Sequence, residues 1–256
     1  MQILGNGFLA RCLSEAFTER FPEVTAIAAG VSSHATVAPE EFVREARLVH
    51  EVLRECKDRH RTVLFFSSAS FAVYGSTGAL CAEGDHLAAP LSGYGRSKLA
   101  LESAIRKSEV PYLILRLSHL VGRHQRVHQL LPGLMRQVRA GAVRVHKGAH
   151  RDLLDVHDLV DAIGRLLDQG ARDEVLNMAS GAPQHVEAIL DGIEKRLGTS
   201  AVRTYVPGGT AITRVSIRRL QRYVPDFRPG LWSAQSYLDD LLDTYVPYYA
   251  QGSAGE

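Results

Sequence analysis

Short apolar runs alternate with helix-length amphipathic segments, and this alternation is the feature that most constrains the fold. The apolar runs predict strands at residues 1–4, 24–29, 63–66 and 112–117, and the amphipathic segments predict helices at 8–20, 40–58 and 94–107. Parallel strands need crossover connections long enough to hold a helix, so this order is typical of α/β proteins. The sequence therefore predicts an α/β fold with a mainly parallel sheet.

After residue 118 the alternation becomes irregular. The pattern there predicts helices at 130–140, 156–167, 186–197 and 233–244, with short strands at 143–146 and 175–178. We therefore predict a first domain over residues 1–118 and a smaller C-terminal α+β lobe over residues 119–256. The helix at 156–167 is expected to pack back on the first domain.

Composition excludes several classes of protein. With 256 residues, 45% of them apolar, the chain is long enough for one large domain or one domain with a modest second lobe. Its 30 lysines and arginines nearly balance its 28 aspartates and glutamates, which argues against binding nucleic acid through phosphates. No apolar run approaches the roughly 18 to 20 residues of a membrane span, and no signal-peptide pattern opens the sequence. We expect a soluble, cytoplasmic protein with neither a membrane nor a nucleic-acid partner.

Metal and disulfide sites are not indicated. The three cysteines, Cys12, Cys56 and Cys81, are an odd number without the spacing of metal ligands. Two histidine pairs, 124/128 and 146/150, have i, i+4 spacing, but no carboxylate or thiol completes a ligand set. The sequence therefore predicts no bound metal.

A small-residue turn, Gly5-x-Gly7-x-x-Ala10, joins the first strand to the first helix. Such a turn lets the backbone approach a pyrophosphate, whose negative charge the helix N-terminus attracts. The same spacing also occurs in tight turns that bind nothing. The acidic residue that dinucleotide folds place about 20 residues on, at the end of the next strand, is absent. The strand at 24–29 ends instead in Ala28-Ala29-Gly30, so either the ribose site suits a 2′-phosphate or the usual second and third strands are missing.

A phenol and an ammonium lie one helical turn apart in Tyr94-Gly-Arg-Ser-Lys98. Residues at i and i+4 share a helix face, where a lysine can lower the pKa of a phenol. A tyrosine tuned in this way can exchange a proton with a carbonyl or carbinol oxygen while a hydride moves to or from carbon. The alternative is an ordinary amphipathic helix start. Upstream, the hydroxyls of Ser67, Ser68 and Ser70 follow the strand at 63–66, at the sheet edge where open α/β folds bind ligands.

These elements together resemble the extended short-chain dehydrogenase/reductase family of the NAD-dependent epimerase/dehydratase type, closest to short nucleotide-sugar 4-keto reductases. The motifs that carry the resemblance are GNGFLA, SSASFAVYG, YGRSK, LILRLSHLVG, RDLLDVHDLV and VLNMASG, in this order. They span most of the chain. The resemblance implies a Rossmann-like NAD(P)-binding domain followed by a substrate-binding lobe.

The resemblance also implies roles for single residues. Tyr94 is expected to be the catalytic acid/base and Lys98 its partner, which also holds the nicotinamide ribose. Ser70 is the expected donor to the substrate oxygen, with Ser68 as its competitor. The implied cofactor-binding residues are Gly5, Gly7, Phe8, Leu9, Ala29, Gly30, Ser67, Ser68, Tyr94, Lys98 and Leu120. The implied substrate-binding residues are Ser70, His119 and Arg151, the last at the nucleotide diphosphate. The alternative for Arg151 is a surface salt bridge with Asp152 or Asp155.

One departure concerns the adenosine end of the cofactor site. In the family the serine strand is the fifth of the sheet, but here only the strand at 24–29 separates it from the first. The resemblance therefore implies that two βα units are absent and that the adenosine end is unusually exposed. NAD and NADP both remain open, and Arg11 and residues 32–34 are candidate phosphate contacts.

The motifs lack residues that dehydratases and carbon-deprotonating epimerases of the family use, which argues against these two reactions. Dehydratases of the family place Asp-Glu after the substrate-oxygen hydroxyl, whereas this chain has Phe71 and Ala72. Epimerases that deprotonate carbon use a cysteine near the same place, and Cys81 lies well beyond Ser70. We predict a nucleotide-sugar 4-keto reductase. The alternatives are a nucleotide-sugar 4-epimerase, an oxidoreductase acting on a non-sugar carbonyl, and a non-catalytic dinucleotide-binding module. A homodimer through the helices at 40–58 and 94–107 is also expected.

Overall fold

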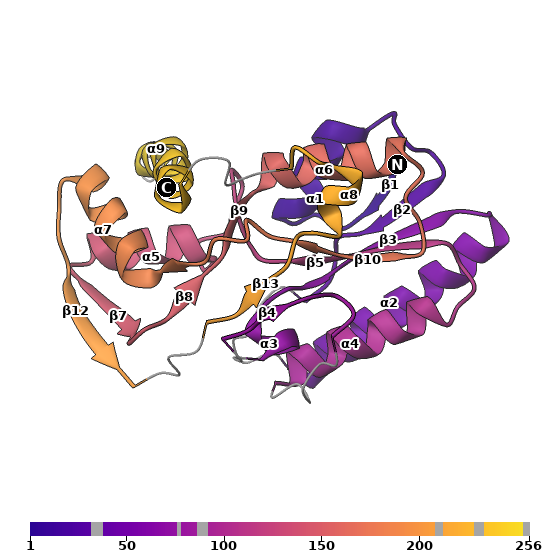
Figure 1. The fold of residues 1–256 in the computed structure, drawn as a ribbon, viewed down its shortest axis with the longest axis horizontal. Helices are drawn as coiled ribbons and strands as arrows, with labels where there is room; N and C mark the ends of the chain where they lie inside the picture. Colours follow the sequence, from indigo (N-terminus) through magenta and orange to yellow (C-terminus); the bar gives the residue numbers. More distant parts are fainter. Residues whose placement is uncertain (32–37, 76–77, 86–91, 208–211, 228–232, 253–256) are drawn as a thin grey trace.

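The fold is built around a five-stranded parallel sheet (Figure 1). The computed structural model describes residues 1–31, 38–75, 78–85, 92–207, 212–227 and 233–252. The strands of the central sheet are β1 (Gln2–Leu4), β2 (Val24–Ile27), β3 (Thr62–Ser68), β5 (Tyr112–Leu117) and β10 (Glu174–Met178), adjacent in that order. All four pairings are parallel. The predicted α/β fold is thus confirmed.

β1 lies at the edge of this sheet and pairs directly with β2, from Gln2 opposite Thr25 to Leu4 opposite Ile27. β2 in turn pairs with the serine strand β3. No strand of the described residues covers the outer side of β1. The sheet therefore has the shortened form that the resemblance implies. β1 lies next to β2, and β2 lies next to the serine strand β3.

Helices cover both faces of the sheet (Figure 1). One face packs against α1 (Phe8–Phe17) and α6 (Val156–Asp168), and the other against α2 (Pro39–Asp58) and α4 (Gly93–Arg106). Along β3, Leu64 and Phe66 point to the first face while Val63 and Phe65 point to the second, as the two-residue period of a strand requires. Both faces are apolar because helices bury both sides of a parallel sheet.

A second lobe holds its own core (Figure 1). It is formed by α5 (Leu130–Arg139), α7 (Val186–Leu197) and α9 (Ala234–Gly252), with β7 (Ala142–His146) and β12 (Val202–Val206) paired in parallel. The remaining short elements are α3 (Phe71–Tyr74), β4 (Leu80–Cys81), β6 (His119–Val121), β8 (His150–Arg151), β9 (Leu153–Asp155), β11 (Gln184–His185), β13 (Arg214–Val215) and α8 (Leu220–Tyr223). None of the helices in the described ranges has the length and hydropathy to span a membrane.

Three features differ from the expected elements. Only the helix at 156–167 was expected to pack back on the first domain. The strand β10 also joins it, because β10 pairs with β5 and extends the central sheet. β3 runs on to Ser68, since its backbone stays paired with β5 beyond the apolar run. α9 continues past residue 244 through Pro247, because Tyr245 and Val246 are buried in the core of the second lobe.

Gly5 has a backbone requirement that other residues do not meet. Its φ is +134°, and a Cβ added there would lie 2.5 Å from the carbonyl oxygen of Ala28. Gly5→Ala is therefore expected to lower the free energy of unfolding by about 2 kcal/mol or more, through backbone strain plus a clash. Denaturant unfolding measures this. Gly84→Ala, where an added Cβ meets open space, is the control and should change it by under about 0.5 kcal/mol. Equal effects of the two variants would contradict the account.

Candidate active site

A cavity of about 650 Å³ opens at the carboxyl ends of the central strands. Its walls are the turns that follow β1, β2, β3 and β5, together with segments of the second lobe. Open α/β sheets bind their ligands at this edge. Of the residues predicted from the sequence, those that line it are Gly7, Phe8, Leu9, Ala29, Gly30, Ser67, Ser68, Ser70, Tyr94, Lys98, His119, Leu120 and Arg151. Gly5 does not line it and instead shapes the turn against Ala28.

The glycine turn presents the start of α1 to this cavity. Gly7 is the N-cap, Phe8 and Leu9 line the wall, and the first turn of the helix holds no acidic residue. The first N–H groups of a helix have no partner within the helix, and its dipole is positive there. Arg126 adds a full positive charge near this turn. Its guanidinium would lie 4.0 Å from a Cβ added to Gly7. This end of the cavity is suited to an anion such as a pyrophosphate.

Tyr94 and Lys98 reach the cavity from the first turns of α4. Ser92 caps the helix by accepting a hydrogen bond of 3.1 Å from the N–H of Gly95. The Lys98 ammonium lies 5.7 Å from the centre of the Tyr94 ring. It donates to Glu45 Oε1 at 2.7 Å and to the carbonyl oxygen of Phe66 at 3.3 Å. The i, i+4 spacing thus brings the phenol and the ammonium together, beside a carboxylate that the sequence reasoning missed.

The serine segment after β3 turns sharply at the cavity. Ser70 is the N-cap of α3, and its Oγ accepts hydrogen bonds from Ser68 Oγ at 2.8 Å and from the N–H of Ala72 at 3.3 Å. Ser68 and Ser70 are both buried. Ser67 Oγ donates to Glu102 behind the sheet edge. All three serines line the cavity, where Ser68 and Ser70 pair with each other while Ser67 is tied to Glu102.

Behind the serines lies a buried polar network. Arg116 of β5 donates to Glu102 of α4 at 2.7 Å and 3.0 Å, and to the hydroxyl of Tyr74 at 2.8 Å. Tyr74 donates in turn to Asn177 Oδ1 of β10 at 2.7 Å. Burial raises the pKa of Tyr74 to about 12, so its hydroxyl keeps the proton that it donates. The network ties α3 to α4, β5 and β10, and so holds the serine turn in place.

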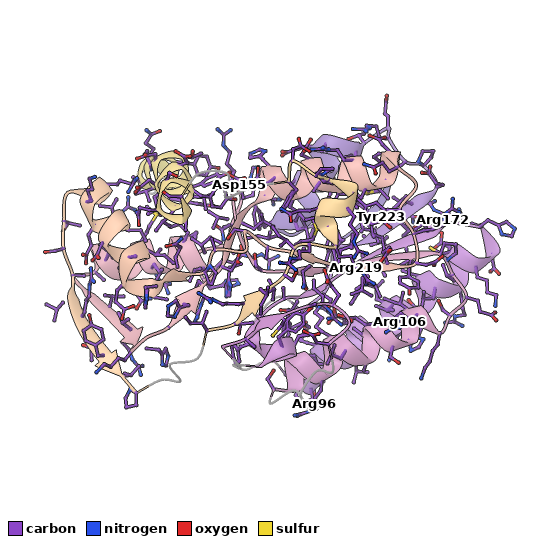
Figure 2. The ribbon with its side chains drawn as sticks, in the orientation of Figure 1. Arg96, Arg106, Asp155, Arg172, Arg219 and Tyr223 are labelled. Carbon is purple, nitrogen blue, oxygen red and sulfur yellow. The ribbon has the colours of Figure 1, made fainter. Side chains whose placement is uncertain are left out.

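Arg151 approaches from the second lobe. Its guanidinium donates to the carbonyl oxygen of His150 at 2.7 Å, and burial lowers its pKa. Asp152 accepts instead from Ser180 and Gly181, and Asp155 caps α6 and accepts from the Tyr245 hydroxyl of α9. Figure 2 shows Asp155 at the junction of the two lobes. Within the described residues Arg151 thus has no ion pair with either aspartate, and it lines the cavity.

The charged residues of the cavity wall are all basic. Lys98 and Arg151 are joined there by Arg44 of α2 and by Arg126, two arginines that the sequence reasoning missed. No aspartate or glutamate is among the described residues that line the cavity. A concave wall with charges of one sign concentrates ligands of the opposite sign. The cavity is therefore suited to a ligand with several negative charges.

The other candidate contacts lie elsewhere. Arg11 is exposed on α1 and does not line the cavity, so the structure does not bring this candidate phosphate contact to the site. Residues 32–34 fall outside the described residues. Cys81 is buried in β4 and does not line the cavity. The described residues form no cluster of three or more histidine, cysteine, aspartate or glutamate side chains that could hold a metal ion.

The outward face of α2 and α4 bears on the expected homodimer. Its exposed residues include Val43, Arg47 and Arg54 of α2 with Arg96 and Arg106 of α4. Figure 2 shows Arg96 pointing away from the molecule. A four-helix interface through this face stays a prediction, in which charged side chains would lie against the second copy.

Solved structures share this fold. RMD from Pseudomonas aeruginosa complexed with NADPH superposes with a TM-score of 0.75 at 22% identity, covering 96% of this chain and 98% of that one. A UDP-galactose 4-epimerase gives 0.78 at 19% identity, covering 95% and 98%. The dTDP-glucose 4,6-dehydratase of Bacillus anthracis str. Ames, in complex with NAD, gives 0.74 at 21% identity, covering 95% and 77%. No curated protein matches the chain in sequence.

A family model identifies the chain more directly. It matches residues 7–179, a span that runs from the glycine turn through the serine strand, Tyr94, Lys98 and Arg151 to the end of β10. The match covers more than half of the chain and includes all the catalytic positions inferred from the sequence. The protein therefore belongs to the NAD dependent epimerase/dehydratase family.

Proposed function

We propose that the protein is an NAD(P)-dependent oxidoreductase that reduces the 4-keto group of a nucleotide-linked sugar. The observation that carries this proposal is the meeting of Tyr94, Lys98 and Ser70 with Arg151 at one cavity. The first three residues fit proton transfer at a carbonyl oxygen, and the arginine fits a diphosphate. The cofactor assignment is supported by the glycine turn, the open start of α1 and the basic wall beside it.

The proposed reaction divides the work between the cofactor and the chain. Bound NAD(P)H supplies the hydride that reduces the carbonyl carbon. Tyr94 gives its phenolic proton to the carbonyl oxygen, which becomes the hydroxyl of the product, and a proton from solvent restores the phenol. Lys98 holds the nicotinamide ribose and places a positive charge beside the phenol, where negative charge develops as the proton leaves.

Ser70 is the proposed donor to the substrate oxygen. Its Oγ accepts hydrogen bonds from Ser68 Oγ and from the N–H of Ala72, and it lines the same cavity as Tyr94 and Lys98. Ser68, which donates to Ser70, supports it in this role.

One observation favours reduction over 4-epimerisation, and a second favours a sugar nucleotide over a neutral carbonyl compound as the substrate. A 4-epimerase must retain its cofactor while the hydride is returned, whereas β1 is an edge strand among the described residues, which supports the expectation of an exposed adenosine end. Cofactor exchange after each turnover is then easier. Arg151 lines the cavity without an aspartate partner, and a neutral ketone would leave its charge without a ligand.

The test is turnover of a panel of UDP-, GDP- and dTDP-linked sugars, the 4-keto members with NADH or NADPH and the 4-hydroxy members with NAD⁺ or NADP⁺. The proposal predicts that one 4-keto sugar nucleotide is reduced while an equal amount of NAD(P)H is consumed. Interconversion of two 4-epimers without net consumption of cofactor would establish the epimerase instead. Cofactor binding with no turnover on any member of the panel would favour a non-catalytic dinucleotide-binding module.

A further inference from the structure

Glu45 is a buried carboxylate that the proposed reaction does not yet use. It lies on the apolar face of α2, and its side chain and that of Lys98 are only 1% and 4% exposed. One oxygen, Oε1, accepts from the Lys98 ammonium at 2.7 Å. The other, Oε2, is buried and has no hydrogen-bond partner among the described residues. A carboxylate is rarely placed in such surroundings, because burying it is unfavourable unless a partner compensates its charge.

The position of Glu45 limits where the Lys98 ammonium can be. An ammonium has three N–H donors. Two of them are directed to Glu45 Oε1 and to the carbonyl oxygen of Phe66, at 2.7 Å and 3.3 Å. Lys98 also lines the cavity, so one donor remains for a ligand there. The carboxylate thus fixes both the place and the direction of the single donor that faces the cofactor side.

Gly30 shows that this pair is built into the wall of the cavity. A Cβ on Gly30 would lie 2.4 Å from Glu45 Oε1 and 3.0 Å from the Lys98 ammonium. Gly30 itself lines the cavity. The pair therefore occupies the space of the missing side chain, directly behind the backbone that a bound cofactor would touch.

We propose that Glu45 is a positioning residue, which holds the Lys98 ammonium behind Gly30 and presents its one remaining donor to the ribose of the bound NAD(P)H. This inference rests on the proposed function, because it assigns Lys98 to the cofactor. Glu45 acts through Lys98 and does not itself touch the reacting atoms. Its charge keeps the ammonium paired inside the wall, so the donor is in place before the cofactor binds.

The experiment measures the dissociation constants of NADH and NADPH by the fluorescence of the reduced nicotinamide. Glu45→Gln removes the charge of the partner and is expected to weaken binding roughly tenfold, about the effect of one charge-assisted hydrogen bond. Glu55→Gln is the matched control on the same helix. Glu55 pairs at 3.4 Å with Arg59, away from the cavity, so this variant should bind as the wild type does.

A double-mutant cycle separates positioning from a general structural role. In a Lys98→Met background the ammonium is gone, so Glu45→Gln should add less than about twofold to the dissociation constant. In turnover, Glu45→Gln alone should lower kcat roughly tenfold and leave the KM of the sugar nucleotide nearly unchanged. A tenfold loss of binding that persists in the Lys98→Met background would show that Glu45 acts independently of Lys98, and would overturn the proposal.

A second variant and the wild-type protein provide two further tests of the role of Glu45. Should Glu45→Gln fail to fold, Glu45→Asp keeps the charge but shortens the side chain, and it is expected to weaken NAD(P)H binding severalfold. Either variant binding the cofactor as tightly as the wild type would overturn the role of Glu45. A wild-type protein that binds neither NADH nor NADPH would instead contradict the proposed function itself, so the two failures are distinguishable.

Discussion

Replacing Tyr94 by Phe is expected to lower kcat for the keto sugar nucleotide by about 10²–10⁴-fold, the usual contribution of a positioned acid or base. The variant keeps the aromatic ring and loses only the phenolic oxygen, so the 5.7 Å contact between the ring and the Lys98 ammonium can persist. Binding of NAD(P)H should therefore stay within about twofold of the wild type, since the lost group acts on the substrate oxygen. Steady-state kinetics and cofactor fluorescence measure the two effects.

A matched control supports this reading. Tyr205 is exposed on β12 and does not line the cavity, so Tyr205→Phe should leave kcat unchanged. Ser70→Ala is expected to fall between the two variants, because one hydrogen bond to the oxygen is lost while the proton donor remains. Wild-type turnover by Tyr94→Phe would remove the phenol from the mechanism.

Replacing Glu102 by Gln is expected to lower the free energy of unfolding by about 3–5 kcal/mol, the effect of removing one partner from a buried ion pair. The Arg116 and Glu102 side chains are only 5% and 4% exposed, so water cannot solvate the charge that is left. Burial lowers the pKa of Arg116, but its hydrogen bonds to Glu102 more than offset this and hold the pKa above its usual value. An arginine stays protonated in proteins, so the variant leaves a buried guanidinium without its carboxylate. Denaturant unfolding measures the change.

An exposed pair provides the contrast. Arg20 and Asp168 are joined at 2.8 Å, but their side chains are 52% and 57% exposed. Asp168→Asn should therefore change the free energy of unfolding by less than about 1 kcal/mol. If the two variants lose the same amount of stability, the network behind the serine turn is not the structural support described above.

The sequence predicted those parts of the site that depend on local spacing. Tyr94 and Lys98 lie one helical turn apart, and the serines follow a strong apolar strand, so each group could be placed before any tertiary contact was known. The shortened sheet was implied by the family resemblance, which places the serine strand fifth, whereas the sequence of this chain has only one strand between it and the first. β10 was expected as a strand, but its place beside β5 depends on a crossover through the second lobe, which local patterns do not encode.

The residues that were missed have tertiary causes. Glu45 lies four residues before Val49 and seven before Val52, on the apolar stripe of its helix, and an acidic residue in such a stripe is a usable signal of a buried partner. Arg126 lies in the loop between β6 and α5, and only the approach of the two lobes brings it to Gly7. Arg44 was missed for a similar reason, because the packing of α2 on the sheet brings it to the cavity.

Transfer of deuterium from cofactor to sugar tests the central claim most directly. The protein is incubated with the 4-keto sugar nucleotide that it turns over and with NAD(P)H carrying deuterium at nicotinamide C4 on the transferred face, and the product is examined by mass spectrometry and NMR. Reduction at this cavity predicts one deuterium in each product molecule, bonded to sugar C4, and formation of that product by Tyr94→Phe at a rate about 10²–10⁴-fold lower. A product without deuterium, or with deuterium at any other carbon, would contradict the account.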